Sequence, residues 1–276
     1  MPIIDTHHHF WKYTDAEYGW ISDKMKVIRR DFLPADLHKE LKSAGVDGAV
    51  SVQARQTVQE SDDLLAYAEK NDFLKGVVGW VDLRDKNCDK DLERLAKYKK
   101  FKGVRHVIQD EPDDNFILGT AFNEGIKKLA KYDLRYDILI FEKHLKPSIK
   151  FVDQHPKQVF ILDHIAKPRI KDRILSPWRE NMIELAKRPN VYCKISGMLT
   201  EADWDKWTAA DLAPYFDSTL QAFGPKRLMI GSDWPVMLVA GKYKQWIDMV
   251  KQVVSRYSAA EQDRIFYKNA VEAYKL

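Results

Sequence analysis

The segment Pro2-Ile3-Ile4-Asp5-Thr6-His7-His8-His9-Phe10-Trp11 opens the chain with an apolar run that ends in three histidines. Such a run is typical of a β-strand, in which alternate side chains share a face. We therefore expect His7 and His9 to point one way and His8 the other. Two imidazoles one strand-step apart suit metal binding or acid–base chemistry. The segment predicts a functional site at the end of the first strand.

The composition is that of an ordinary globular protein. The 276 residues are 45% hydrophobic and 31% charged, with a formal net charge of +4. A chain of this length can bury a large core. The basic run at 97–102 has no continuation elsewhere, so we expect a solvated helix end and no nucleic-acid binding.

No segment predicts a membrane partner or an exported protein. No stretch reaches the ~18–20 apolar residues that a membrane span needs. The N-terminus lacks the basic and apolar regions of a secretory signal. Cys88 and Cys193 are too few and too far apart for a disulfide framework. These features predict a cytoplasmic protein with reduced thiols, and none of them specifies an oligomeric state.

Strand-like and helix-like segments alternate along the whole chain. After the first strand, a polar loop over residues 12–30 carries aromatic side chains that either line a pocket or anchor the loop. Further strands are expected at 46–53, 74–83, 103–108, 134–141, 158–163, 191–196 and 227–230. Helices are expected at 34–44, 57–71, 89–98, 119–131, 147–154, 177–187 and 212–223, with two more at the C-terminus.

Eight strand–helix units in this length predict an α/β fold with a closed parallel barrel. We expect a single-domain (β/α)8 TIM barrel over residues 1–276. An open dinucleotide-binding sheet would carry a glycine-rich turn after its first strand, where the histidines stand instead.

Active sites of (β/α)8 barrels lie at the carboxyl ends of the strands. Histidines at the first and sixth strand ends, with a carboxylate at the eighth, form the narrowest pattern among the polar strand ends. The polar residues at these ends are His7, His9, Gln53, Arg55, Asp82, Arg84, Arg105, His106, Tyr136, Asp137, Asp163, His164, Lys194, Ser196, Ser232 and Asp233.

Four motifs together resemble the amidohydrolase superfamily. Ile4–Trp11 is similar to the first-strand signature of that superfamily. Leu162–Pro168, Lys194–Gly197 and Gly231–Pro235 resemble its amidohydrolase-2 branch of sugar lactonases, such as L-fuconolactonase and L-rhamnonolactonase. The resemblance spans nearly the whole chain. It implies a hydrolase that opens the ring of a small-molecule sugar lactone in carbohydrate catabolism.

The sequence departs from the binuclear members of the superfamily. Those members carry a bridging lysine or glutamate at strand four and a histidine at strand five. Arg105 or His106, and Tyr136 or Asp137, stand at these places here. The resemblance therefore implies at most one divalent, Zn-like metal ion. Metal-free catalysis is the alternative, because related lactone hydrolases are of both kinds.

The resemblance implies that His7, His9, His164 and Asp233 would be the ligands of this single ion. We expect Asp233 to be the general base that deprotonates the attacking water, with His164 beside it. A bound ion would lower the pKa of its water toward ~7. Without an ion, the histidines would polarise the substrate carbonyl. Arg105 would hold the developing oxyanion or a substrate carboxylate, because guanidinium presents a fixed fork of donors.

Four further residues are expected to bind substrate: Arg55, His106, Tyr136 and Lys194. For two of these residues a purely structural role is equally compatible with the sequence: His106 could belong to the core, and Lys194 could form an ion pair. Asp5 is expected to fix an imidazole rather than to bind a metal.

Two other functions stay open at this point. One is metal-dependent, non-oxidative decarboxylation of an aromatic or related acid, which would use the same ligands without a hydrolytic water. The other is a barrel that has lost catalysis and only binds a ligand. The second is disfavoured because the polar strand ends are present apart from the binuclear pair.

Overall fold

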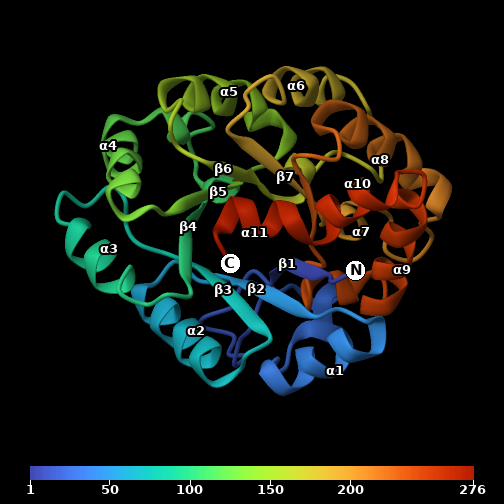
Figure 1. Cartoon of the computed structure of the whole chain (residues 1–276), viewed down its shortest axis with the longest axis horizontal. Helices are drawn as coiled ribbons and strands as arrows, with labels where there is room; N and C mark the ends of the chain where they lie inside the picture. The colour runs from blue at the N-terminus through green and yellow to red at the C-terminus, as the bar shows by residue number, and fades with distance from the viewer.

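The computed structural model describes residues 1–276 and has eight parallel strands that pair in sequence order, with helices around them (Figure 1). The expected (β/α)8 barrel is confirmed. The strands are β1 (Ile4–His8), β2 (Gly48–Val52), β3 (Leu74–Gly79), β4 (Phe101–Val107), β5 (Arg135–Leu139), β6 (Phe160–Leu162), β7 (Val191–Ile195) and β8 (Leu228–Ile230).

The outer helices follow the strands as expected. They are α1 (Pro34–Ala44), α2 (Val58–Lys70), α3 (Asp89–Leu95), α4 (Thr120–Leu129), α5 (Leu145–Gln154), α6 (Trp178–Leu185), α8 (Ala209–Phe223) and α9 (Tyr243–Val254). Three shorter helices are α7 (Met198–Glu201), α10 (Ala259–Asp263) and α11 (Asn269–Tyr274). The sequence did not predict α7, because one helical turn is too short to show a periodic pattern.

Several strands are shorter than the sequence predicted. The sixth was expected at 158–163 and spans only Phe160–Leu162. Gln158 before the strand and Asp163 after it are also buried, so burial continues past the point where the ladder ends. Asp163 already begins a tight turn, η6 (Asp163–Ala166), which directs the following side chains into the mouth of the barrel.

The barrel is closed between β1 and the residues that follow β8. The backbone N–H of Asp233 donates to the carbonyl of His7 at 2.8 Å, and that of His9 donates to the carbonyl of Trp234 at 2.7 Å. An isolated parallel bridge joins His8 to Trp234. The hydrogen bonds that close the barrel therefore also fix Asp233 beside the histidines of β1.

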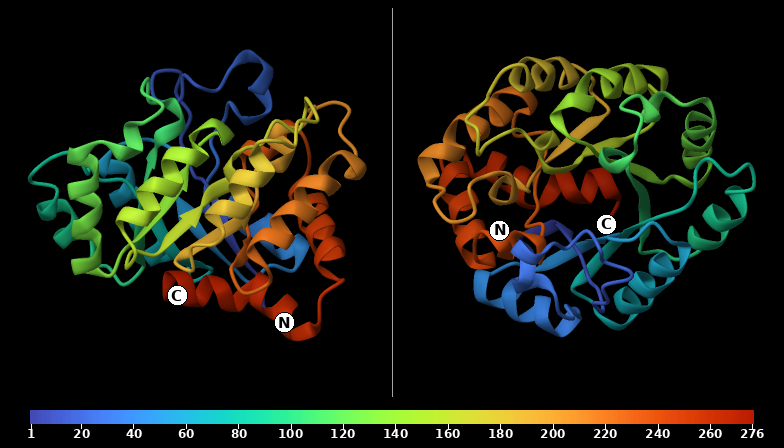
Figure 2. Two further views of the ribbon diagram at one scale, coloured as in Figure 1. Left: turned by 90° about the horizontal axis from the view of Figure 1, so that it is seen from above. Right: turned by 180° about the vertical axis from the view of Figure 1, so that it is seen from behind.

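The amino-terminal end of the barrel is filled by apolar side chains and covered by α11. Ile4, Val50, Ile161 and Met229 pack there with Tyr274 and other residues of α11. Figure 2 shows α11 at one end of the barrel and the long loop after β1 at the opposite end. That opposite end is the open one, and it is where the site lies.

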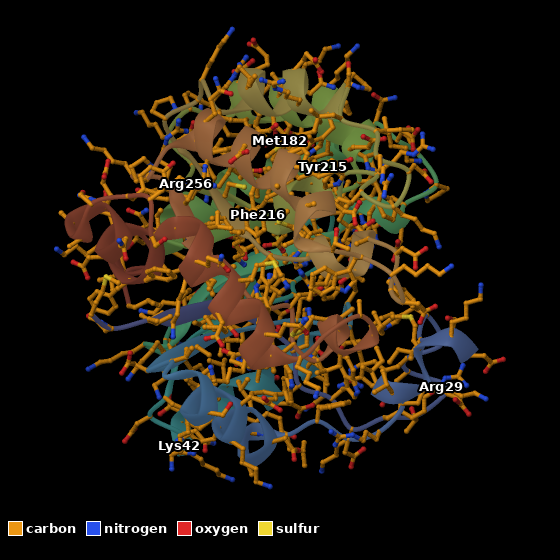
Figure 3. The ribbon with its side chains drawn as sticks, turned by 90° about the vertical axis from the view of Figure 1, so that its right-hand side faces the viewer. Arg29, Lys42, Met182, Tyr215, Phe216 and Arg256 are labelled. Atoms are coloured by element: carbon orange, nitrogen blue, oxygen red, sulfur yellow. The ribbon has the colours of Figure 1, made fainter.

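The helical layer is tied together by large aromatic side chains. The ring of Tyr215 on α8 lies 5.3 Å from that of Trp178 on α6, and Phe216 on α8 stacks on Trp246 of α9 at 5.8 Å. Tyr215 and Phe216 are seen beside Met182 of α6 in Figure 3. This rigid support lets the strand ends hold precise positions.

The loop after β1 combines both roles that its aromatic residues suggested. Trp11 and Tyr18 are buried and anchor it to the core. Its turn η1 (Asp23–Ile28) contributes Met25 to the wall of a cavity, to which Trp20 also belongs.

Other expectations from the sequence concern membranes and cysteines. None of the helices combines the length and apolar character needed to cross a bilayer. Cys88 and Cys193 are both buried and free, as expected.

Candidate active site

A cavity of about 370 Å³ opens at the carboxyl ends of the strands. It is lined by His9 from the end of β1, Arg105 from β4, His164 after β6 and Asp233 after β8. The sequence-predicted residues at four separated strand ends are thus brought together at one place.

Three imidazoles and one carboxylate converge at the bottom of this cavity. Oδ1 of Asp233 lies 3.4 Å from Nε2 of His9, 3.7 Å from Nε2 of His164 and 3.8 Å from Nε2 of His7. Nε2 of His7 is 3.2 Å from Nε2 of His9. The predicted parity of β1 is confirmed, because His8 faces away and contacts Oγ of Ser51 at 3.0 Å.

The other ring nitrogens of these histidines have partners that fix the imidazole planes. Nδ1 of His9 lies 2.9 Å from the carbonyl oxygen of Val52, which can only accept a hydrogen bond. Nδ1 of His164 lies 2.9 Å from Oγ of Ser196. Nδ1 of His9 must therefore donate to the carbonyl of Val52, which leaves the Nε2 lone pair of His9 facing Asp233. Ser196 holds His164 with its Nε2 toward Asp233.

His7 is held from both sides by charged groups. Its Nδ1 lies 3.3 Å from Oδ1 of Asp163 and 3.2 Å from Nζ of Lys194. Its Nε2 lies 3.2 Å from Nη1 of Arg105. This imidazole is therefore connected to a set of buried charges beneath the cavity.

The protonation states suit ligation and base catalysis. Burial, together with the charges of Lys194 and Arg105, holds the pKa of His7 well below its usual value. Burial does the same to the pKa of His164, against the opposing effect of Asp233. Burial alone would raise the pKa of Asp233, but His164, His9 and Lys167 outweigh it and leave that pKa below its ordinary value. The neutral imidazoles of His7 and His164 therefore face an ionised carboxylate at neutral pH.

A left-handed backbone turn places His164 in the cavity. His164, Ile165, Ala166 and Lys167 have φ values of 53°, 48°, 60° and 46°. Each non-glycine residue in this region costs roughly 1–2 kcal/mol. Such strain is tolerated where surrounding structure enforces it, and it concentrates at functional sites.

The serine–glycine motif after β7 supports this turn. Ser196 accepts or donates the hydrogen bond to Nδ1 of His164, as described above. A Cβ atom on Gly197, whose φ is +69°, would lie 2.6 Å from Cβ of His164. The motif thus combines one polar partner with the absence of a side chain, and both are needed for His164 to fit.

Asp5 has a different role from the expected one. Its Oδ1 accepts from the backbone N–H groups of Ser232 at 2.8 Å and His7 at 3.1 Å, and its Oδ2 accepts from the hydroxyls of Ser232 at 2.6 Å and Tyr243 at 3.0 Å. The expectation that Asp5 fixes an imidazole is wrong. It fixes the backbone next to His7 and Asp233, because its carboxylate is directed along the strand ends.

The converging groups fit a metal ion. His7, His164 and Asp233 each offer one ligand atom, and these atoms all lie within 4.8 Å of one another. His9 adds a fourth ligand atom, because its Nε2 lies 3.2 Å from Nε2 of His7 and 3.4 Å from Oδ1 of Asp233. Imidazole nitrogen and carboxylate oxygen are ligands that Zn²⁺ accepts in a single-metal site.

Arg105 reaches the cavity, but its donors are largely engaged. Its Nη1 lies 3.0 Å from Oδ2 of Asp163, and its Nε and Nη2 donate to the side chain of Gln53 at 3.0 and 2.8 Å. Nη2 also donates to the backbone carbonyl of Gln53. The guanidinium therefore contributes a positive charge to the cavity floor, while most of its N–H groups are already used by Gln53 and Asp163.

Lys194 is not part of the cavity wall. Its Nζ is fully buried and lies 2.6 Å from Oδ2 of Asp137 and 2.9 Å from Oδ1 of Asp163. Asp137 also accepts from the hydroxyl of Tyr274 at 2.7 Å. Of the two roles left open for Lys194, its position corresponds to the ion pair.

Three other predicted substrate-binding residues are directed elsewhere. His106 accepts from Trp80 Nε1 at 3.2 Å, contacts Glu111 at 2.6 Å and faces the helical layer. Tyr136 packs in the core between β5 and the helices, beside Phe151 and other rings. Arg55 forms ion pairs with Glu17 and Asp63 outside the cavity. On β4 and β5, alternate side chains face in and out, so Arg105 and Asp137 face inward and their neighbours outward.

Several residues of the site were missed or left as strand caps. Asp163 is the central carboxylate beneath the cavity, in contact with His7, Arg105 and Lys194. Arg105 and Lys194 are cations on buried barrel strands, and a buried cation needs a carboxylate close to it. These two residues were the sequence signal for Asp163. Further cavity residues come from segments after the strands, which carry no periodic pattern: Gln109, Lys167, Thr200 and Glu201.

Comparison with known proteins extends these observations. The amidohydrolase family matches residues 4–276. An L-fucono-1,5-lactonase of Burkholderia multivorans is 38% identical over 99% of this chain and 96% of its own length. An L-fucono-1,5-lactonase of Burkholderia ambifaria is 35% identical over 99% and 95%. A crystal structure of a Burkholderia multivorans amidohydrolase with bound zinc has a TM-score of 0.94 and 39% identity over both full chains.

Proposed function

The chain belongs to the amidohydrolase family, and we propose that it is a lactonase that opens the ring of a sugar-acid lactone of the L-fucono-1,5-lactone type. The observation that carries the proposal is the convergence of His7, His9 and His164 on Asp233 at the cavity in the open end of the barrel. The full-length similarity to two L-fucono-1,5-lactonases supports the substrate class.

Asp233 is the general base in the proposed reaction. Its lowered pKa keeps it ionised at neutral pH, so Oδ1 or Oδ2 accepts a proton from the attacking water. The water oxygen bonds to the carbonyl carbon of the lactone. The bond between that carbon and the ring oxygen then breaks, and the ring oxygen receives the proton from Asp233. The product is the open-chain hydroxy acid.

The positive charge of Arg105 at the cavity floor favours the negative charge that develops on the carbonyl oxygen. Arg105 is kept in place by Gln53 and Asp163, so it needs no rearrangement during the reaction. Asp163 also aligns His7. These contacts make the floor of the cavity a preorganised electrostatic environment.

We further propose that His7, His9, His164 and Asp233 hold one Zn²⁺-like ion. Such an ion would polarise the lactone carbonyl and lower the pKa of bound water. The donor types, the neutral state of His7 and His164, and the zinc in the crystal structure of the similar amidohydrolase support this. Metal content measured on the purified protein should be one ion per chain and should fall in the His9→Ala variant, whether or not activity is assayed.

Decarboxylation of an aromatic acid is the competing function. Its substrate carries a carboxylate, which is best bound by a guanidinium with two free N–H groups. The only guanidinium of the cavity wall is Arg105, and its donors already bind Gln53 and Asp163. The cavity wall therefore offers no free bidentate site for an aromatic carboxylate, and the full-length similarity to two L-fucono-1,5-lactonases favours a lactone.

The test is an assay with a pH indicator over a panel of aldonolactones, beginning with L-fucono-1,5-lactone. Ring opening yields a carboxylic acid that ionises, so the lactonase proposal predicts acid release above the uncatalysed rate. Carbon dioxide release from aromatic acids, without acid release from any lactone, would overturn the proposal in favour of a decarboxylase.

A further inference from the structure

Two uncharged polar groups in the cavity wall have no hydrogen-bond partner in the protein. Oε1 of Gln109 and Oγ1 of Thr200 are buried and unpaired, and both residues line the cavity. Most buried polar atoms in native proteins are paired, so each exception needs an explanation. A ligand that supplies hydrogen bonds in the cavity explains both.

Two charged groups of the same wall also lack a partner of opposite charge within contact distance. Nζ of Lys167 has an aromatic neighbour instead, since it lies 5.4 Å from the ring centroid of Phe141. The carboxyl of Glu201 makes no hydrogen bond, and burial raises its pKa, while Lys167 opposes this effect from a distance. Both side chains are therefore available to a molecule in the cavity.

These four residues come from three different segments. Gln109 lies in η2 (Ile108–Asp110) after β4, Lys167 ends the left-handed turn after β6, and Thr200 and Glu201 lie in α7 after β7. Trp204 Nε1 donates to the carbonyl of Thr200 at 2.8 Å and so holds the end of α7 in position. The fold therefore holds these unpaired groups in defined positions.

We propose that Gln109, Lys167, Thr200 and Glu201 form a hydroxyl-binding wall that selects a hydroxylated sugar lactone over an unsubstituted lactone ring. This inference rests on the proposed lactonase function and adds the residues that determine its specificity. A sugar hydroxyl both donates and accepts. Glu201 and Oε1 of Gln109 accept from such hydroxyls, Lys167 donates to them, and Thr200 can do either.

The expected preference for a hydroxylated lactone can be estimated, because the polar groups of the wall have no hydrogen-bond partner in the protein. A site built to bind a substrate hydroxyl rejects an analogue without it strongly, because its buried polar groups then stay unpaired. Without hydroxyls, the ring also leaves the half-buried Glu201 carboxyl without a donor. We therefore expect kcat/KM of the wild-type enzyme to be at least about 100-fold higher for L-fucono-1,5-lactone than for δ-valerolactone.

Variants of the wall separate recognition from chemistry. Thr200→Val and Gln109→Leu should each lower kcat/KM for L-fucono-1,5-lactone about threefold to tenfold, mainly through KM, because one neutral hydrogen bond is lost. Glu201→Gln should lower it about 10-fold to 100-fold, since hydrogen bonds to a charged group are stronger. The ratio of kcat/KM for L-fucono-1,5-lactone to that for δ-valerolactone should therefore fall in each of the three variants, and the midpoint of thermal unfolding reports that each variant is folded.

Matched controls carry the same change away from the cavity. Thr219 has a buried Oγ1 without a partner, like Thr200. Glu142, like Glu201, is a half-buried residue whose carboxyl forms no hydrogen bond, and one of its oxygens is buried. Neither residue lines the cavity. Thr219→Val and Glu142→Gln should leave the ratio between the two lactones unchanged.

Three outcomes would overturn the inference. Equal losses on both lactones would mean that the wall acts in the chemistry or the fold, and unchanged values on both would mean that it binds nothing. A wild-type enzyme that hydrolyses both lactones equally well would also contradict selection by the wall, while leaving lactonase activity intact. Failure of the wild type on every lactone would instead overturn the proposed function, and this inference with it.

Discussion

Two polar regions at the open end of the barrel differ in one respect, which is whether their side chains are paired. The paired charge layer, formed by Arg105, Asp137, Asp163 and Lys194, is buried, and each member contacts an opposite charge at 2.6 to 3.0 Å. The hydroxyl-binding wall also contains a lysine and a carboxylate, Lys167 and Glu201, but neither forms an ion pair. Pairing, rather than residue type, therefore separates the groups that position the site from the groups that bind substrate.

Removal of a charge from the paired layer should have the largest effect on stability. Lys194→Met leaves Asp137 and Asp163 without their shared cation, and breaking such a buried pair costs about 3–5 kcal/mol. We expect a loss of this size in the free energy of unfolding measured with urea. Combination with Asp137→Asn should cost less than the sum of the two changes, because the orphaned charge is removed.

The control for this prediction is Lys187→Met. Lys187 forms an ion pair with Glu184 at 2.6 Å, but both side chains are largely exposed. Exposed pairs contribute little, so the change in free energy should stay below about 1 kcal/mol. If Lys187→Met and Lys194→Met had equal effects, burial and pairing would not be what distinguishes the layer.

Glu60 tests the role of pairing in a different way. It is a buried carboxyl whose hydrogen-bond partners are backbone N–H groups rather than a buried cation. Burial raises the pKa of Glu60 to about 7, while the backbone N–H groups of Arg55 and Ala54 oppose the rise. Because this pKa is raised on folding, the folded state is stabilised while Glu60 is protonated, and this stabilisation is lost as the pH rises from the unfolded value of about 4.5 through about 7. The total loss is at most about 3 kcal/mol.

Glu60→Gln removes the charge and keeps an acceptor for these N–H groups. Thermal unfolding measured between pH 4 and 9 should therefore show a smaller decline for the variant than for the wild type. Parallel pH profiles for the two proteins would show that Glu60 does not titrate with this shift.

Ser196 belongs to neither region, and its replacement should affect the site while leaving the stability of the fold unchanged. Ser196→Ala removes the partner of His164 Nδ1 and leaves the imidazole free to turn. Loss of such a supporting contact typically costs about 10-fold to 100-fold in activity or metal affinity. We expect a loss of this size in kcat or zinc affinity with an unchanged midpoint of unfolding; unchanged kcat and unchanged metal content would mean that Ser196 does not orient His164.

The sequence predicted the barrel and the centre of the site for a physical reason. Strand periodicity and the end-of-strand rule place His7, His9, His164 and Asp233 correctly, because both depend on local pattern and on a topology that parallel strands impose. Closure between β1 and β8 then brings the first and last motifs together.

The pairing of charges could not be predicted in the same way. His106 and Tyr136 stand one residue from the inward positions of Arg105 and Asp137, and a shift of one residue reverses the face of a strand. Lys194 and Arg105 looked like free cations because their common partner, Asp163, is far away in sequence. The wall was missed because α7 and the turn at Lys167 depend on left-handed backbone that no periodic pattern encodes.

The central claim is that Asp233 is the base of a lactone-hydrolysing site, and the Asp233→Asn variant tests it most directly. Asparagine keeps the shape of the side chain but cannot accept the proton of water. The account predicts that kcat for L-fucono-1,5-lactone falls roughly 10³-fold while the unfolding midpoint is unchanged. An Asp233→Asn enzyme that retained the full wild-type rate would contradict it.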